Sequence, residues 1–347
     1  MKKLASNGSP AKAGANGNGR NGGSNGRLKP LAPAGRGRLL SPAGGNPGTL
    51  EIPAYLLGFP FSYGADVVNN SWMEDLDTKG RQVDLRRATR QFLELYNFLS
   101  SEGVVYLLPS PPNGLQDLVF TANLGVVLEH LPGKDTVVLS NFTVASRRGE
   151  TEVGRRFFEA MGYRTIVAPD RFEGEAELKH LHDNVYLGGY GLRSSREVYD
   201  WMERAFDMRI VRLEQKDPYL YHLDTTIFPI TRESTLVCTE LFDRREVAQI
   251  EKVTNVVDVS ADHCFSGITN SVRLYNTILN ASHLHDLKAG TEEYREEVSK
   301  NRRLTDLASE MGFEVTFVNL SEYLKAGAVL SCMVMHLNRA SYAFRLL

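Results

Sequence analysis

The run YLYHLDTTIFPI, residues 219–230, places a histidine and an aspartate two positions apart among apolar and β-branched residues. Successive side chains of a β-strand point to opposite faces, so a strand here predicts that His222 and Asp224 share one face. A histidine in such a run is commonly a core residue that is hydrogen-bonded to a neighbour. A functional pair is the alternative, and residues elsewhere in the chain discriminate between the two interpretations.

Short strand-like runs alternate with amphipathic helices on both sides of this stretch. Residues 50–347 show no fixed-period repeat and no Pro/Gly-rich linker, which predicts a single α/β domain built from several small strand–helix–strand modules. The turns lack a GxGxxG or GxxxxGKS/T loop, so a nucleotide-binding fold gains no support. Apolar spacing and helix-end residues predict helices over 85–102, 150–163, 196–206, 243–252 and 290–312.

Charge divides the 347-residue chain unevenly. The net charge is −2, but residues 1–50 hold eight basic residues and no acidic one. Residues 1–49 are also rich in Gly, Asn, Ala and Pro, and we expect them to form a disordered basic tail. The acidic remainder argues against nucleic acid as a partner. No apolar run approaches the roughly 18 residues that a bilayer span needs, and no apolar segment of a signal peptide follows Lys2 and Lys3.

The three cysteines are Cys238, Cys264 and Cys332, and no two of them form a CxxC pair. This sparse set argues against a disulfide framework and against a zinc site, and it predicts a reducing, cytoplasmic location. Cys264 has His263 beside it and could pass for a reactive pair. Adjacent side chains on a strand point to opposite faces, however, so Cys264 ranks behind Cys332 as a candidate nucleophile.

Polar residues interrupt the apolar runs at several strand ends and loops, where function is expected. Cysteine is a suitable nucleophile for an amidine-like carbon, and a nearby histidine can serve as acid and base. Carboxylates would bind a cationic group, and an arginine would bind a carboxylate. Together these side chains suit a small molecule that is cationic at one end and anionic at the other, as L-arginine is. The interrupting residues are Asp117 and Asn123, Glu173 and Glu175, Arg193, and Cys332.

Five segments of the chain, in this order and spacing, resemble the guanidino-group-modifying enzymes of the pentein fold. They are DLVFTANLGVV, RFEGEAEL, GGYGLRSS, YHLDTTIFPI and YLKAGAVLSC. This superfamily includes arginine deiminase, dimethylarginine dimethylaminohydrolase, the amidinotransferases and the arginine dihydrolases, and the resemblance covers about residues 52–340. It implies an α/β pentein of five ββαβ modules around a central channel. It also implies that neither a metal nor an organic cofactor is needed.

The resemblance implies a role for each polar residue. Cys332 matches the nucleophile that attacks the guanidinium carbon, and His222 matches the general acid and base. Asp224 matches the carboxylate that holds the guanidinium nitrogens. The glutamate that orients His222 is expected to be Glu173, with Glu175 as the alternative. Further expected substrate-binding residues are Arg193, which would anchor the substrate carboxylate, together with Asp117, Asn123, Glu175 and either Asn69 or Asn70.

The sequence also departs from the pattern of its relatives. It reads FTAN where arginine deiminases have an aspartate, so that neutral Asn123 replaces a carboxylate. The FTAN form resembles the arginine dihydrolases, and it also occurs in chains that resemble dimethylarginine hydrolases. On this resemblance, hydrolysis of L-arginine to ornithine, ammonia and carbon dioxide is the favoured activity. Citrulline-forming hydrolysis of arginine or methylated arginine, amidino transfer to an amine, and a non-catalytic binding module are the alternatives. The expected partner is a small arginine-like molecule, and a homo-oligomer is left open.

Overall fold

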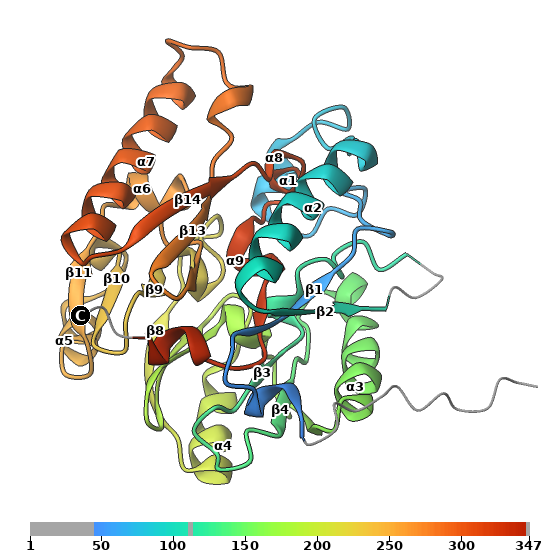
Figure 1. The fold of residues 1–347 in the computed structure, drawn as a ribbon, viewed down its shortest axis with the longest axis vertical. Helices are drawn as coiled ribbons and strands as arrows, with labels where there is room; N and C mark the ends of the chain where they lie inside the picture. Colours follow the sequence, from blue (N-terminus) through green and yellow to red (C-terminus); the bar gives the residue numbers. More distant parts are fainter. Residues whose placement is uncertain (1–44, 110–113, 345–347) are drawn as a thin grey trace, which may run out of the picture. The chain divides into compact units, whose positions relative to one another are not determined.

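The computed structural model describes residues 45–109 and 114–344. These residues contain five three-stranded sheets, together with the helices and turns that connect the strands (Figure 1). These residues belong to one of the two units into which the chain divides, residues 38–347. The predicted tail lies outside the described residues as far as residue 44. The described structure begins before residue 50, because a 3₁₀ turn spans Pro47–Thr49 and the Pro47 carbonyl accepts a hydrogen bond from Asn338.

The sheets share one topology. In each, the central strand runs antiparallel to one neighbour and parallel to the other, and a helix connects the two parallel strands. Four of these ββαβ modules follow one another along the chain: β3 (Gly125–Val127), β4 (Thr136–Leu139), α3 (Glu150–Ala160) and β5 (Arg164–Val167); β6 (Leu178–His182), β7 (Val185–Tyr190), α4 (Arg196–Phe206) and β8 (Arg209–Glu214); β9 (Ile227–Pro229), β10 (Ser234–Val237), α5 (Arg244–Ile250) and β11 (Asn255–Asp258); β12 (Ser271–Leu274), β13 (Thr277–Ala281), α7 (Glu292–Glu310) and β14 (Glu314–Val318).

Both ends of the described chain contribute to the fifth module. Strand β1 (Ala54–Gly58), helix α2 (Leu85–Glu102) and strand β2 (Val104–Leu108) come first in the sequence, and β15 (Met335–His336) pairs antiparallel with β1. Figure 1 shows the five connecting helices around the outside, with the strands toward the middle. The predicted α/β pentein of five ββαβ modules is thereby confirmed.

The structure confirms the predicted helices. They could be predicted because their signals lie within a few residues along the chain. In α2, for example, the apolar residues at positions 88, 92, 95 and 99 form one buried stripe. Asp84 caps the helix by accepting hydrogen bonds from the backbone N–H groups of Arg86 and Arg87. Helix α7 begins and ends two residues inside its predicted bounds, and α4 matches its prediction.

The strand predictions around the polar residues were wrong. His222 and Asp224 do not lie in a strand: Leu223–Thr225 forms a 3₁₀ turn, and β9 begins only at Ile227. Similarly, Asn123 ends the 3₁₀ turn Thr121–Asn123, and Cys332 lies in the short helix α9 (Leu330–Met333). The alternation of apolar and polar residues that indicates a strand does not reveal such turns. A 3₁₀ turn closed by i→i+3 hydrogen bonds is only a few residues long, too short to leave a periodic pattern of its own. Other short elements are the 3₁₀ turn Gly174–Ala176, α1 (Ser71–Asp75), α6 (Ala261–Phe265) and α8 (Ser321–Leu324).

These turns precede the first strand of a module and pack against one another. The Thr121 hydroxyl lies within hydrogen-bonding distance of the carbonyls of Leu56 and Met333, 2.7 and 2.8 Å away, which ties one turn to β1 and to α9. Gly174 has a φ of +69°, and a Cβ there would lie 2.5 Å from the Ala122 carbonyl oxygen. Glycine is therefore required for the close approach of the two turns. The fold thus gathers side chains from distant segments at one place.

No helix among the described residues has the length and apolar character that crossing a membrane requires.

Candidate active site

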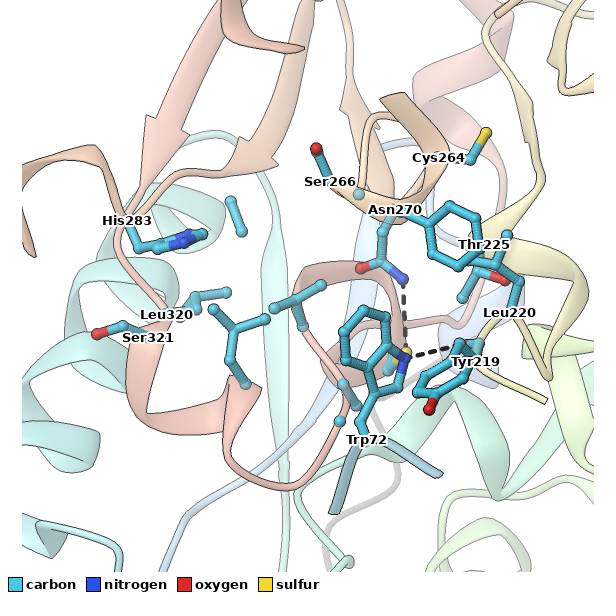
Figure 2. A pocket seen from close by; sticks show the side chains of 18 of the residues that line it. Trp72, Tyr219, Leu220, Thr225, Cys264, Ser266, Asn270, His283, Leu320 and Ser321 are labelled. Atoms are coloured by element: carbon cyan, nitrogen blue, oxygen red, sulfur yellow. Dashed lines mark hydrogen bonds between the residues drawn. The ribbon is translucent and has the colours of Figure 1, made fainter. Parts of the chain in front are cut away.

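A cavity of about 730 Å³ opens beside these turns (Figure 2). Cys332, His222 and Asn270 lie in its wall, each from a different module, together with the aromatic residues Trp72 and Tyr219. The indole N–H of Trp72 donates to the Tyr219 carbonyl at 2.8 Å, which fixes this side of the wall. The cavity therefore brings the predicted nucleophile and the predicted acid and base to one space.

Cys332 is 3% exposed and is held between two polar side chains. Its Sγ lies 3.5 Å from Oδ2 of Asp224, and Nδ2 of Asn270 donates to Sγ at 3.6 Å. The neighbouring Ser331 completes the arrangement, because its hydroxyl donates to the same Asp224 oxygen at 2.6 Å and its backbone N–H donates to Asn270 at 2.8 Å. Burial, and then the charge of Asp224, raise the pKa of the Cys332 thiol to about 12. The resting thiol is therefore protonated at neutral pH.

Asp224 keeps one oxygen free. Its Oδ2 accepts from Ser331 and Cys332, whereas its Oδ1 is buried and has no hydrogen-bond partner among the described residues. A buried acceptor without a partner costs free energy, which a ligand that donates hydrogen bonds can recover. The free oxygen thus suits a cationic donor beside the Cys332 thiol.

His222 forms a buried pair with Glu173, in which Nε2 and Oε2 lie 2.8 Å apart. Burial lowers the pKa of His222, although Glu173 opposes this effect. Burial would raise the pKa of Glu173, but the hydrogen bond from His222 and the charge of Arg193 lower it to about 2. Both lowered pKa values are consistent with a neutral imidazole that donates its Nε2–H to an ionised Glu173. Nδ1 of His222 is then left as an acceptor.

Glu175 does not contact His222, which corrects the alternative prediction for the partner. One carboxylate oxygen of Glu175 lies 2.6 Å from Nδ1 of His336 and 3.0 Å from a guanidinium nitrogen of Arg339, and the other accepts from the His336 backbone at 2.8 Å. The turn at Gly174 directs the two glutamates to different neighbours. Glu175 therefore anchors the strand that follows Cys332.

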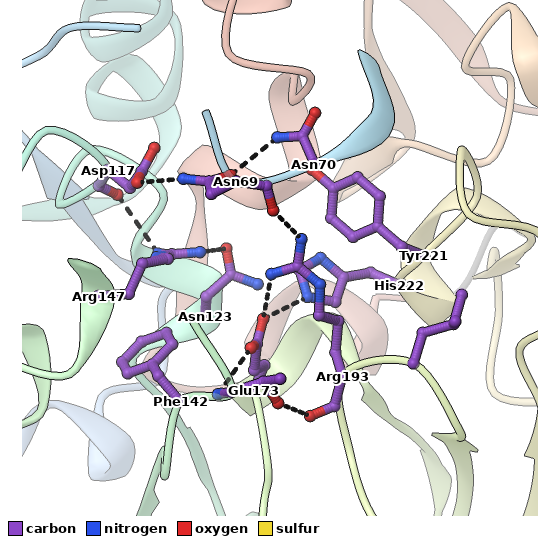
Figure 3. Close-up of polar contacts among 12 residues, drawn as sticks. Asn69, Asn70, Asp117, Asn123, Phe142, Arg147, Glu173, Arg193, Tyr221 and His222 are labelled. Carbon is purple, nitrogen blue, oxygen red and sulfur yellow. Dashed lines mark hydrogen bonds and ion pairs between the residues drawn. The ribbon is translucent and has the colours of Figure 1, made fainter. Parts of the chain in front are cut away.

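Arg193 lies beside His222 and is 8% exposed (Figure 3). Its guanidinium donates to the Asn69 carbonyl at 2.8 Å and to Oε2 of Glu173 at 3.5 Å, and it lies 4.5 Å from the ring centroid of Tyr221. In this position the charge of Arg193 supports the ionised form of Glu173. Its predicted contact with a substrate carboxylate stays a prediction.

The remaining predicted residues form a buried polar layer beside Arg193. Asp117 accepts from Nδ2 of Asn69 at 2.8 Å, and burial raises the pKa of Asp117. Asn123 accepts from Arg147 at 3.1 Å. Asn70 has a structural task, since its side-chain oxygen caps α1 at the Met73 N–H. Of the predicted site residues, Cys332 and His222 belong to the cavity wall in the described part of the chain.

Sequence reasoning missed Arg147 and Ser331. Arg147 stands in the run ASRRGE at a helix start, where a basic pair is commonly exposed, yet it is buried and paired with Glu150. The spacing of Arg147 and Glu150 by three residues was the available signal. Ser331 precedes the predicted nucleophile, but nothing in the sequence indicated its contact with Asp224.

No cluster of three or more His, Cys, Asp or Glu side chains that could hold a metal ion occurs within residues 45–109 and 114–344.

For the substrate expected from the sequence, L-arginine, replacing Asp224 with asparagine should raise the KM by about 10- to 100-fold, because a charge-assisted hydrogen bond to a buried cation contributes roughly 1.5–3 kcal/mol. The same change should lower the pKa of the Cys332 thiol, since the charge of Asp224 raises it. Steady-state kinetics and a thiolate absorbance titration measure the two effects. An unchanged KM would contradict a contact between Asp224 and the substrate.

Several proteins of similar sequence have names that refer to arginine chemistry. The bifunctional arginine dihydrolase/ornithine cyclodeaminase AgrE of Nostoc sp. is 29% identical over 287 residues, which are 81% of this chain and 37% of AgrE. The N(G),N(G)-dimethylarginine dimethylaminohydrolase of Mycobacterium tuberculosis is 26% identical over 82% of this chain and 85% of the relative. The chain spans little more than a third of the length of the bifunctional relatives.

Solved structures share the fold. The N-terminal domain of ArgZ bound to product, described as an arginine dihydrolase from the ornithine–ammonia cycle in cyanobacteria, superimposes with a TM-score of 0.71 and 27% identity over 82% of this chain and 97% of that domain. A second structure of the ArgZ domain contains a covalently bound reaction intermediate. The family described as N,N dimethylarginine dimethylhydrolase, eukaryotic, matches residues 61–339. This chain therefore belongs to the eukaryotic N,N dimethylarginine dimethylhydrolase family.

Proposed function

We propose that this protein hydrolyses the guanidino group of L-arginine or a methylated arginine through a covalent intermediate on Cys332. The supporting observation is that a buried thiol and a histidine line one cavity, with Asp224, which keeps one oxygen free, in contact with the thiol and Glu173 paired with the histidine. The free Oδ1 of Asp224 would accept hydrogen bonds from the guanidinium. The guanidinium carbon would then lie beside Sγ of Cys332.

Substrate binding would activate the thiol. The pKa of about 12 keeps Cys332 neutral in the free enzyme, and a cationic guanidinium held beside it favours the thiolate. The thiol proton passes to His222, and the thiolate attacks the guanidinium carbon. His222 then gives this proton to the departing nitrogen, which leaves as ammonia or an amine, and an amidino-thioether remains on Cys332.

His222 would next accept a proton from water, and the resulting hydroxide attacks the amidino-thioether carbon. Loss of the Cys332 thiolate yields a ureido group, as in citrulline. A second round on this group releases a second ammonia and leaves a thiocarbamate, whose hydrolysis gives a carbamate that decays to ornithine and carbon dioxide. In total, one arginine and two water molecules give ornithine, two ammonia and carbon dioxide.

The arginine dihydrolase reaction is favoured over single hydrolysis. Asn123 stands where arginine deiminases have an aspartate, and the relatives AgrE and ArgZ have names that refer to arginine dihydrolase. Hydrolysis of dimethylarginine to citrulline and dimethylamine is the second candidate, and the family assignment together with the Mycobacterium tuberculosis relative favours it. Three free thiols support a reducing compartment, for which we propose the cytoplasm.

The products discriminate between these reactions. We would incubate the full-length protein with L-arginine and with asymmetric dimethylarginine and follow ammonia, dimethylamine, citrulline and ornithine together. Ornithine with two ammonia per arginine supports the dihydrolase. Citrulline with one ammonia indicates a deiminase, and dimethylamine from the methylated substrate alone indicates the second candidate. No product from either substrate would contradict the hydrolase proposal.

The raised thiol pKa also predicts how Cys332 responds to pH. In the free enzyme, alkylation of Cys332 by iodoacetamide should accelerate about tenfold per pH unit from pH 7 to 9 without reaching a plateau, because the thiolate fraction keeps rising below the pKa of about 12. Peptide mass spectrometry measures alkylation at each cysteine. A plateau near pH 7 would mean that the resting group is already a thiolate.

A further inference from the structure

The side-chain NH₂ group of Asn123 is an unused hydrogen-bond donor, because Arg147 occupies the side-chain oxygen. The Arg147 guanidinium donates from Nη1 to Oδ1 of Asn123 at 3.1 Å. Arginine has donors but no acceptor, so the side-chain oxygen must face it and the NH₂ group must face away. The Asn123 nitrogen is buried and has no hydrogen-bond partner among the described residues. Figure 3 shows this nitrogen on the side of Glu173, Arg193 and His222.

Arg147 is itself fixed in place. Two of its nitrogens, Nε and Nη2, donate to the two carboxylate oxygens of Glu150 at 2.9 and 2.8 Å, and Nη2 also donates to the Asp117 carbonyl at 3.4 Å. The guanidinium carbon lies 4.7 Å from the ring centroid of Phe142. The bidentate pair and the ring leave the guanidinium little freedom to turn. Rotation of the Asn123 amide would place its NH₂ group against the Arg147 donors.

The direction of the donor restricts what Asn123 can bind. A guanidinium consists of donors alone and has no atom that could accept from the Asn123 NH₂ group. A carboxylate could accept this hydrogen bond, but the two guanidinium groups nearby are already paired and would not balance its charge. Arg147 is paired with Glu150 and Arg193 with Glu173, and the Asp117 carboxylate would repel a further negative charge. A neutral oxygen suits the position better. Hydrolysis of a guanidino group creates such an oxygen, because a ureido oxygen replaces one nitrogen.

From these contacts we propose that Arg147 is a positioning residue, which directs the Asn123 amide so that it donates to the ureido oxygen formed by the first hydrolysis. The inference rests on the proposed function and specifies its second step. The hydrogen bond retains the ureido compound and draws electron density from its carbon, so that Cys332 attacks again and ammonia leaves before citrulline dissociates. An aspartate at position 123 would also accept from Arg147 but would offer no donor.

The test measures the ornithine-to-citrulline ratio formed from L-arginine by the full-length protein. Assays at pH 8 keep Glu150 ionised, because burial raises its pKa to about 7. Asn123→Asp should lower the ratio about tenfold or more, the factor that one buried hydrogen bond supplies. Added citrulline should be consumed by the wild type and more slowly, by a similar factor, by the variant.

Two further variants address Arg147 itself. Arg147→Met combined with Glu150→Leu removes the buried pair without leaving a lone charge, and Glu150→Gln keeps the volume but loosens the guanidinium. Both should lower the ornithine-to-citrulline ratio, since the Asn123 amide becomes free to rotate. Glu152→Gln, an exposed position on the same helix α3, is the matched control and should leave the ratio unchanged.

The outcomes separate this inference from the proposed function. Slower arginine consumption with an unchanged ratio in both Arg147 and Glu150 variants would mean that the pair only stabilises the fold, which overturns the inference. Citrulline as the sole wild-type product would also overturn it while leaving guanidino hydrolysis in place. No turnover of any guanidino compound by the wild type would contradict the proposed function itself.

Discussion

Cys332→Ala should reduce arginine turnover by about 10⁴-fold or more, because no other group can take the place of the nucleophile in a covalent mechanism. Sγ lies 3.5 Å from Oδ2 of Asp224, the carboxylate whose other oxygen is free, and no second thiol contacts Asp224 among the described residues. Product formation from L-arginine at saturating concentration measures the effect. Circular dichroism should confirm that the variant remains folded, since alanine replaces a small side chain.

Cys264→Ala is the matched control for this prediction. Cys264 is also buried and also lies in the cavity wall, but it contacts neither Asp224 nor Asn270 in any described hydrogen bond. Turnover by the Cys264 variant should stay within a few-fold of the wild type. Loss of activity in this variant, with activity retained after Cys332→Ala, would assign the nucleophile to the other cysteine.

His222→Gln should slow turnover by about 10²–10⁴-fold, which is the usual contribution of a general acid and base. Glutamine retains a polar group near Glu173 but cannot accept and return a proton at neutral pH. His222 is needed twice, to protonate the departing ammonia and to accept a proton from water. The variant should therefore form product slowly, and any adduct on Cys332 should decay slowly. Stopped assays of product, together with intact-protein mass spectrometry, measure both.

The control for His222 is a histidine that lies outside the proposed machinery. His263 contacts two serine hydroxyls, those of Ser260 and Ser299, and no carboxylate in the described hydrogen bonds. His263→Gln should therefore leave turnover close to that of the wild type. Turnover within tenfold of the wild type after His222→Gln would show that proton transfer is carried by another group.

Helices and modules could be predicted from the sequence because their signals are local. The apolar stripe of α2 and the Asp84 cap occur within a few residues, and so do the signals of α4 and α7. The order of strands and helices then indicated a set of small modules. The pairing of β15 with β1 was not visible in this way, because it joins residues about 280 positions apart.

The site was only partly predictable, for a different physical reason. Residue type and the family resemblance predicted Cys332, His222 and Asp224 as site residues, but the geometry assigned to the last two was wrong because a strand was expected where a 3₁₀ turn occurs. The choice between Glu173 and Glu175 depends on the turn at Gly174, which separates their directions. Sequence patterns do not show which of the two glutamates faces His222. Both are buried and each is paired with a histidine, so neither residue type nor burial separates them.

Arg147 was missed because burial depends on the whole fold. A basic pair at a helix start is usually exposed, and composition gave no reason to expect otherwise. The turn at Thr121 and helix α3 enclose the guanidinium between Asn123 and Glu150. Such a contact can be found only when the modules are placed together.

Mass spectrometry of the protein quenched during turnover tests whether Cys332 carries a covalent intermediate. Digestion of the wild type and of His222→Gln after mixing with L-arginine labelled at the guanidino carbon would locate any covalent adduct. The label should be attached to the peptide containing Cys332 and should be absent after Cys332→Ala. Label on the peptide of Cys238 or Cys264, or product formation with no labelled peptide at any quench time, would contradict an intermediate on Cys332.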